Sequence, residues 1–217
     1  MDLTTRQTAP RFGAMLIVLA LVAMIAFLPS RYHLVPEWVG YTAMSLMLLA
    51  MILVWITQQR PWLLRLGRVC EFAAVATALA LNSANLLVTA YNLVENPSKL
   101  EAVPLFYTSI GIWVGNILIF TLIYWLVDGG GPDARLNHTN PYPDFDFPGL
   151  NVSAPVRPNW QPGIVDYLFL GFTTSTAFSP TEAMPMTPRA KLLVMLQSTI
   201  SLATIAIVAA RTINILG

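Results

Sequence analysis

The fold is decided by two adjacent stretches, the apolar IVDYLFLGFTTSTAF at 164–178 and the proline-rich SPTEAMPMTP at 179–188. The first stretch has only 15 residues, whereas a helix that crosses a bilayer needs about 20. The second contains three prolines and is not helical. Irregular backbone persists at membrane depth only where protein buries it or where it lines a water-filled cavity. A short helix, an irregular hydroxyl-rich strand and a long final helix therefore predict a re-entrant pore-loop arrangement.

The rest of the chain has the composition of a membrane protein. Of its 217 residues 56% are hydrophobic and only 11% are charged, about half the charged share of a soluble domain. Five runs have the length and apolar character of spanning helices: Phe12–Leu28, Trp38–Ile56, Phe72–Val94, Leu105–Val127 and Leu192–Leu216. We therefore predict an all-α integral membrane fold with five transmembrane helices plus a re-entrant short helix before the last one.

The composition also divides the chain into three regions. Residues 1–127 form a four-helix transmembrane region, 128–163 form an extramembrane loop rich in proline, glycine and aspartate, and 164–217 form the pore-loop-like module with the final transmembrane helix. The loop is too long to be a simple connection. Its aromatic residues favour an ordered cap on the membrane face over a disordered linker: Tyr142, Phe145, Phe147 and Trp160.

The chain has few of the residues that several classes of function require. Cys70 is the only cysteine, and His33 and His138 lie far apart, so a zinc site or a Ser-His-Asp triad is not expected. A net charge of +1 argues against nucleic-acid binding. We expect no enzyme activity and no cofactor. The loop carboxylates are interpreted as solvated, and a divalent-cation site is the minor alternative: Asp128, Asp133, Asp144, Asp146 and Asp166.

A family resemblance rests on Pro185-Met-Thr-Pro-Arg-Ala-Lys191. With the short helix before it, this run makes Asp166–Ile213 resemble the pore module of potassium channels. In that module a pore helix leads into a Thr-Val-Gly-Tyr-Gly-Asp filter, a Thr-Pro turn and an inner helix. The whole chain resembles an uncharacterised bacterial integral membrane protein family whose C-terminal part has this degenerate pore-like character. That resemblance implies a multi-pass protein of the bacterial inner (plasma) membrane, and it implies no activity.

Counting back from this turn without gaps places seven residues on the filter: Thr176, Ala177, Phe178, Ser179, Pro180, Thr181 and Glu182. Ser179 and Thr181 replace the two filter glycines, and Pro180 replaces the tyrosine. Because a β-branched residue in the left-handed conformation costs about 1–2 kcal/mol, we predict that no potassium-type carbonyl ladder forms. Hydroxyl groups and the Glu182 carboxylate would line a wider and less selective pore.

Polar residues form one stripe along the last predicted helix: Gln197, Ser201, Thr204 and Arg211, with Val208 between the last two. In a membrane such a stripe either lines an aqueous path or bonds to a neighbouring helix, and the second interpretation is favoured. Polar residues of the third and fourth predicted spans are interpreted as hydrogen bonding between those two helices: Asn82, Asn85, Thr89, Asn92 and Asn116.

The signals for orientation conflict. With five spans and the N-terminus inside, only Arg31, Lys99 and Arg211 of the twelve basic residues lie outside. This arrangement places the pore-like loop on the cytoplasmic face, opposite to that of a potassium channel. A channel-like orientation inverts the whole chain, and a third option makes 164–178 a short sixth span with both termini inside.

Two functional hypotheses follow. In the first, the chain is a homo-oligomeric pore-loop channel for monovalent ions with a non-standard, weakly selective filter. Because a pore loop encloses a path only in a ring, this hypothesis implies a homotetramer surrounded by membrane lipid. In the alternative, the chain is a non-conducting membrane scaffold or partner subunit with a potassium-channel-like relic fold.

Overall fold

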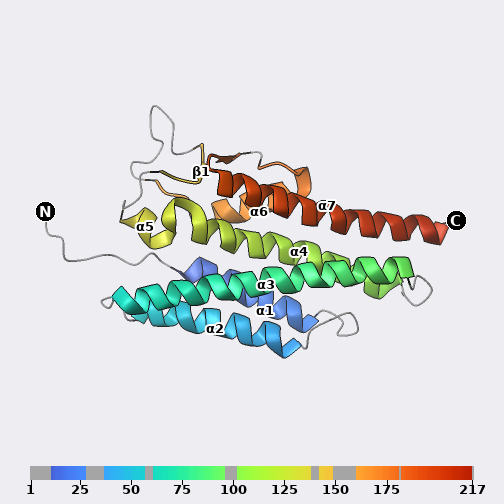
Figure 1. The fold of residues 1–217 in the computed structure, drawn as a ribbon, viewed down its shortest axis with the longest axis horizontal. Coiled ribbons are helices and arrows are strands. Elements are labelled where there is room, and N and C mark those ends of the chain that lie inside the picture. Colours follow the sequence, from blue (N-terminus) through green and yellow to red (C-terminus); the bar gives the residue numbers. More distant parts are fainter. Residues whose placement is uncertain are drawn as a thin grey trace, which may run out of the picture.

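The computed structural model describes residues 11–27, 37–56, 61–95, 102–137, 142–148, 160–180 and 182–216. This part of the chain is mostly helical (Figure 1), which confirms the predicted helical class. Its helices are α1 (Phe12–Phe27), α2 (Glu37–Ile56), α3 (Pro61–Glu95), α4 (Ala102–Val127), α5 (Pro132–Leu136), α6 (Ile164–Ala177) and α7 (Pro188–Leu216), with a 3-10 turn η3 (Asp128–Gly130) after α4. Two short strands, β1 (Phe145–Asp146) and β2 (Met184–Pro185), pair antiparallel.

Three of the helices are long and apolar enough to cross a membrane: Arg65–Glu95 in α3, Val103–Gly130 from α4 into η3, and Pro188–Ala210 in α7. Shorter apolar helical stretches lie at Phe12–Met24 in α1 and Gly40–Leu53 in α2. Helices therefore form at all five predicted runs, and three of them qualify as candidate spans on length and composition. These features make the chain a multi-pass membrane protein candidate.

Four of the five helices begin before their apolar runs, and the third and the last do so by the largest margins. The third was expected from Phe72 but begins at Pro61, because its charged first turns find partners elsewhere in the protein. The last was expected from Leu192 but begins at Pro188. Proline suits the first turn of a helix, and the Thr187 hydroxyl oxygen accepts the Ala190 backbone N–H at 3.3 Å in the manner of an N-cap.

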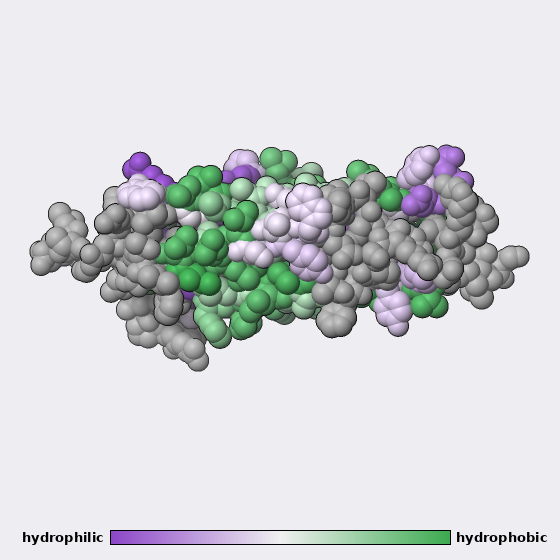
Figure 2. Space-filling model, turned by 90° about the horizontal axis from the view of Figure 1, so that it is seen from below, coloured by the Kyte–Doolittle hydropathy of each residue, from purple (hydrophilic) through white to green (hydrophobic). Residues whose placement is uncertain are grey.

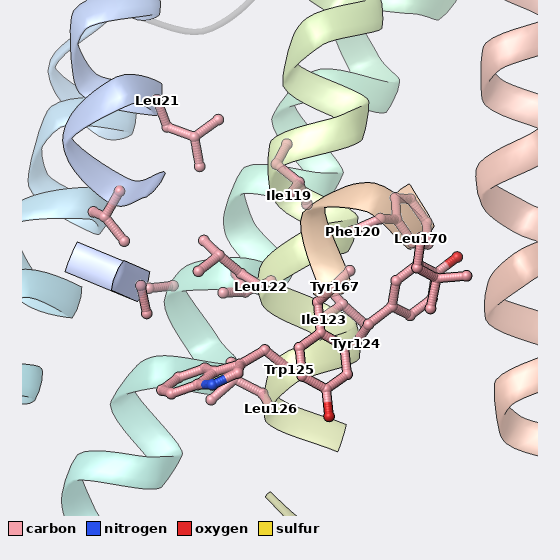
Figure 3. Packing of buried hydrophobic residues seen from close by; sticks show 14 of the residues in the cluster. Leu21, Ile119, Phe120, Leu122, Ile123, Tyr124, Trp125, Leu126, Tyr167 and Leu170 are labelled. Atoms are coloured by element: carbon pink, nitrogen blue, oxygen red, sulfur yellow. The ribbon is translucent and has the colours of Figure 1, made fainter. Parts of the chain in front are cut away.

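The helix α4 is central to the fold. It packs against α1, α3, α6 and α7, and 72% of its apolar window is buried, against 33% for α3 and α7. In Figure 3 its side chains reach toward Leu21 of α1 on one side and toward Tyr167 and Leu170 of α6 on the other. A helix that is apolar all round and buried in this way is a core element.

The short helix α6 and the start of α7 run side by side in the same direction. Tyr167, in the first turn of α6, bonds Asp128 after α4, and Ser175, near the end of α6, bonds Gln197 in the third turn of α7. The chain must therefore return between the two helices, and Figure 1 shows this return passing back along α7. It includes β2, in which Pro185 pairs with Phe145 of β1 and Met184 pairs with Asp146 of β1.

Large apolar side chains are exposed on the outside of the bundle, for example Leu46, Leu49 and Leu53 of α2. On the face drawn in Figure 2, hydrophobic residues form a broad patch. Contiguous apolar surface of this kind marks contact with a membrane or with another protein.

Candidate pore-loop site

Two buried aspartates hold the return segment in place. Asp144 lies just before β1 and has 0% of its surface exposed. Its carboxylate accepts a hydrogen bond from the Thr187 hydroxyl at 2.5 Å and two from the Arg189 guanidinium, from Nε and Nη2, each at 2.5 Å. The turn that begins α7 is therefore built around a carboxylate from the preceding loop.

Asp128 holds the same loop from the other side. It is 1% exposed, and its Oδ1 accepts the backbone N–H groups of Asp144 at 2.7 Å and Phe145 at 3.1 Å. Its Oδ2 accepts the Tyr167 hydroxyl of α6 at 2.6 Å. We call Asp128, Asp144, Tyr167, Thr187 and Arg189 the aspartate cluster. It joins the end of α4, the loop, α6 and α7.

Three consecutive glycines allow the chain to make this junction. Gly129, Gly130 and Gly131 have φ values of 56°, 82° and 96°, a left-handed region that other residues adopt only at a cost. The turn brings the Gly129 N–H to 3.1 Å from Asp144 Oδ2. A Cβ at Gly131 would overlap the end of the Arg68 side chain and lie tight against the Leu126 carbonyl, at 3.0 Å.

The interpretation of the loop carboxylates as solvated is wrong for Asp128 and Asp144. Burial by itself would raise the pKa of Asp144, but the hydrogen bonds of Arg189 and Thr187, the Arg189 charge and the Gly129 N–H together hold that pKa below its ordinary value. Asp133 pairs with Arg11, and Asp166 accepts the Gly163 N–H at the start of α6. Within the described ranges, no group of three candidate ligands is placed to hold a metal ion.

The filter-like residues lie at the end of α6 and in the return. Thr176 and Ala177 close α6, and Phe178 ends it with a φ of 53°. These three residues, together with Ser179 and Glu182, are exposed, and Pro180 is half-buried. Thr181 lies outside the described residues. The Thr176 hydroxyl donates to the Phe172 carbonyl of its own helix at 2.9 Å.

Two members of the α7 polar stripe bond inside the chain. Gln197 is fully buried, and its Nε2 donates to the Gly171 carbonyl at 2.7 Å and the Ser175 hydroxyl at 2.9 Å, both on α6. Its Oε1 accepts the Tyr124 hydroxyl at 2.6 Å. Ser201 accepts Asn116 Nδ2 of α4 at 2.8 Å. These bonds are of the helix-packing type.

The remaining polar residues divide between helix pairs and their own helices. Thr204 donates to the Ile200 carbonyl of its own helix, and the Arg211 side chain lies outside the described part of the structure. Asn82 of α3 donates to the Ile112 carbonyl of α4 at 3.2 Å, as the predicted pairing of these helices requires. Asn116 instead points to α7, where it meets both Ser201 and the Gln197 carbonyl.

Replacement of Gln197 by leucine should lower the free energy of unfolding by about 2 kcal/mol. The change leaves the Tyr124 hydroxyl, the Ser175 hydroxyl and the Gly171 carbonyl without their partner, and each buried polar group left unpaired is costly. Thermal unfolding of the purified protein in mild detergent measures the loss. Thr199→Ala is the matched control, because Thr199 is exposed on the same helix and its hydroxyl donates to the Met195 carbonyl of that helix. Equal stability of the two variants would contradict the inferred role of Gln197.

A second buried ionic group lies at the same end of the bundle and was not expected from the sequence. Arg11, before α1, donates to Glu71 of α3 at 3.0 Å and to Asp133 of α5 at 2.8 Å. Arg11 is 3% and Glu71 0% exposed. The partners in these ion pairs lie far apart in the sequence, as Asp144 and Arg189 do, so no local pattern predicts the pairing.

The arrangement fastens the loop to the helices. The buried carboxylates of Asp128, Asp144 and Glu71 are each held by cations, N–H groups or hydroxyls of the same chain. No known protein family, curated protein or solved structure matches the chain.

Proposed function

We propose that the chain is a multi-pass inner-membrane protein in which α4, α6 and α7 form a pore-loop unit, and that four copies enclose a path for monovalent cations. The observation that carries the proposal is the layout of α6. It runs beside the start of α7 for 14 residues, about 20 Å, and the chain then comes back to the level of α7's first turn. A helix of that length reaches roughly two thirds of the way across a hydrocarbon core.

A preference for cations follows from the end of α6. The last carbonyls of a helix carry a partial negative charge and have no partners within the helix. In the stretch Ile164–Thr187 the charged residues are Asp166 and Glu182, and there is no lysine or arginine. Both features attract positive ions to the exposed tip formed by Thr176–Ser179.

A single chain does not enclose such a path. Thr176–Ser179 and Glu182 are exposed on its surface, whereas the polar groups of Gln197 and Ser201 bond to α6 and α4. Further copies must therefore supply the other walls. The Thr176 hydroxyl already bonds its own helix. Among the described filter-like residues, the Ser179 hydroxyl and the Glu182 carboxylate are the remaining side-chain ligands, which supports weak selectivity.

Replacement of Glu182 by glutamine tests the proposed pore directly. In liposomes that contain the purified oligomer, we expect wild-type potassium or sodium flux, and we expect Glu182→Gln to reduce it by roughly three- to tenfold because a carboxylate ring concentrates cations at the mouth. Glu95→Gln is the matched control, since Glu95 is exposed at the end of α3. Flux of unchanged size and ion preference in Glu182→Gln would show that the filter alignment is wrong.

One observation favours the non-conducting alternative. The exposed face of α7 is apolar, with Leu192, Met195, Leu202 and Ile205 at its surface, and such a face suits lipid or a partner helix better than it suits the wall of an aqueous path. Flux measurements in the same liposomes distinguish the channel from the non-conducting alternative. An intact tetramer without ion flux would support a scaffold or partner subunit, and a monomer in mild detergent would count against both the ring and the pore.

A further inference from the structure

A groove opens between α3 and α7 beside the end of α4, with a volume of about 760 Å³. Its walls are apolar side chains from both helices, among them Val69 and Phe72 of α3 and Leu192 and Leu196 of α7. These four side chains are well exposed, between 44% and 65%. The groove therefore presents a continuous apolar surface that the described residues leave uncovered.

Two arginines line the same groove, Arg68 from α3 and Arg189 from α7, and no aspartate or glutamate is among the lining residues. A guanidinium carries five N–H donors. Within the described chain, Arg68 gives one to the Gly130 carbonyl and Arg189 gives two to Asp144. Both arginines are thus fixed in position by the protein and still have donors for an anion.

The arginines and the apolar side chains are placed to match the two ends of an amphiphile, its charged head group and its apolar chains. The arginines lie level with η3 and the aspartate cluster, where the candidate spans end. The apolar walls continue from there along the spans, one to two turns further into α3 and α7. A soluble anion would use the arginines alone, and an apolar helix of a second copy would use the walls alone.

We propose that this groove binds an anionic phospholipid, with the phosphate between Arg68 and Arg189 and the acyl chains along the apolar walls. The inference is independent of the proposed pore, because neither α6 nor the return segment contributes to the groove. Basic pockets between membrane helices recognise acidic head groups in this way. Each arginine is expected to contribute roughly a fivefold preference over a zwitterionic lipid, or about 25-fold for the two.

Titration of the purified full-length protein in non-ionic detergent tests the proposal, with native mass spectrometry and the midpoint of thermal unfolding as readouts. Dioleoylphosphatidylglycerol should bind about 25-fold more tightly than dioleoylphosphatidylcholine and should raise the midpoint. Inorganic phosphate at the same concentration should do neither. Equal binding of the two lipids, or equal stabilisation by phosphate alone, would overturn the proposal.

Variants of the walls locate the site without removing the arginines' contacts with the protein. Leu192→Trp fills the groove and should weaken phosphatidylglycerol binding at least tenfold. Leu202→Trp is the matched control, because Leu202 is exposed on the same helix outside the groove. Val69→Trp repeats the test from the α3 side in case the first variant fails to fold. Full lipid binding by a folded Leu192→Trp or Val69→Trp protein would show that the lipid does not lie in this groove.

Discussion

Replacement of Arg11 by methionine is expected to lower the free energy of unfolding by about 3–5 kcal/mol. Arg11 is the cation that both Glu71 and Asp133 bind, and the Glu71 side chain has no exposed surface. Without Arg11, Glu71 is a charge buried without its counter-charge, which is more costly than the loss of the contact alone. Thermal or denaturant unfolding in mild detergent measures the change.

The double variant Arg11→Met/Glu71→Leu separates charge imbalance from lost packing. When a buried ion pair is replaced by apolar residues of similar size, stability is often kept, so the double variant should recover most of the loss. Arg65→Met is the matched control, because Arg65 is exposed on α3. A double variant no more stable than Arg11→Met would show that the unpaired Glu71 charge is not the source of the loss.

Replacement of Asp144 by alanine is expected to cost about 3 kcal/mol. The change removes the carboxylate that accepts hydrogen bonds from Thr187, Arg189 and Gly129. Arg189 is 57% exposed, so water compensates part of its loss, and the effect is smaller than for Arg11. Beyond stability, the return segment loses its tie to the loop, and we expect limited proteolysis to cut near β2 in the variant and not in the wild-type protein.

The pKa of Asp144 gives this contribution a pH dependence of definite sign. Its folded-state pKa lies below the ordinary value of 3.8, so the folded protein holds fewer protons on this group than the unfolded chain does in that window. The stabilisation is therefore fully present above about pH 4 and is lost as the pH falls through the folded-state pKa. Asp144→Ala should flatten that part of the acid-unfolding curve. An acid limb of equal slope in wild type and Asp144→Ala would contradict the assignment.

The helices could be predicted because their apolar runs are local. Runs at Phe12, Trp38 and Leu105 end within a few residues of α1, α2 and α4, since burial or lipid contact requires an unbroken apolar stretch. The start of α3 could not be predicted in this way. Arg65, Arg68 and Glu71 interrupt the run, and the helix continues through them because Glu71 meets Arg11 and Arg68 meets Gly130.

The site was predictable only where its pattern is local. Thr187 and Pro188 signal a helix start by themselves, and the stripe through Gln197 follows from helical spacing. The tertiary partners of these residues could not be predicted from local sequence. Asp144 and Arg189 are 45 residues apart in sequence, and nothing in the spacing shows that one will bind the other. An aspartate in a proline- and glycine-rich loop is ordinarily solvated, so its burial depends on the tertiary contacts of Phe145 with Tyr124, whose ring centroids are 4.9 Å apart.

The ion pairs of Arg11 with Glu71 and Asp133, and of Arg189 with Asp144, all fasten one end of the bundle. The fastened end is the point about which the helices can tilt, and we call it the pivot. Figure 1 shows α7 running well past α6 toward its far end. A tilt of about 5° at the pivot moves the tip of a helix of 29 residues, about 43 Å long, by roughly 4 Å. A small tilt at the fastened end is therefore amplified into a larger displacement at the far end of α7.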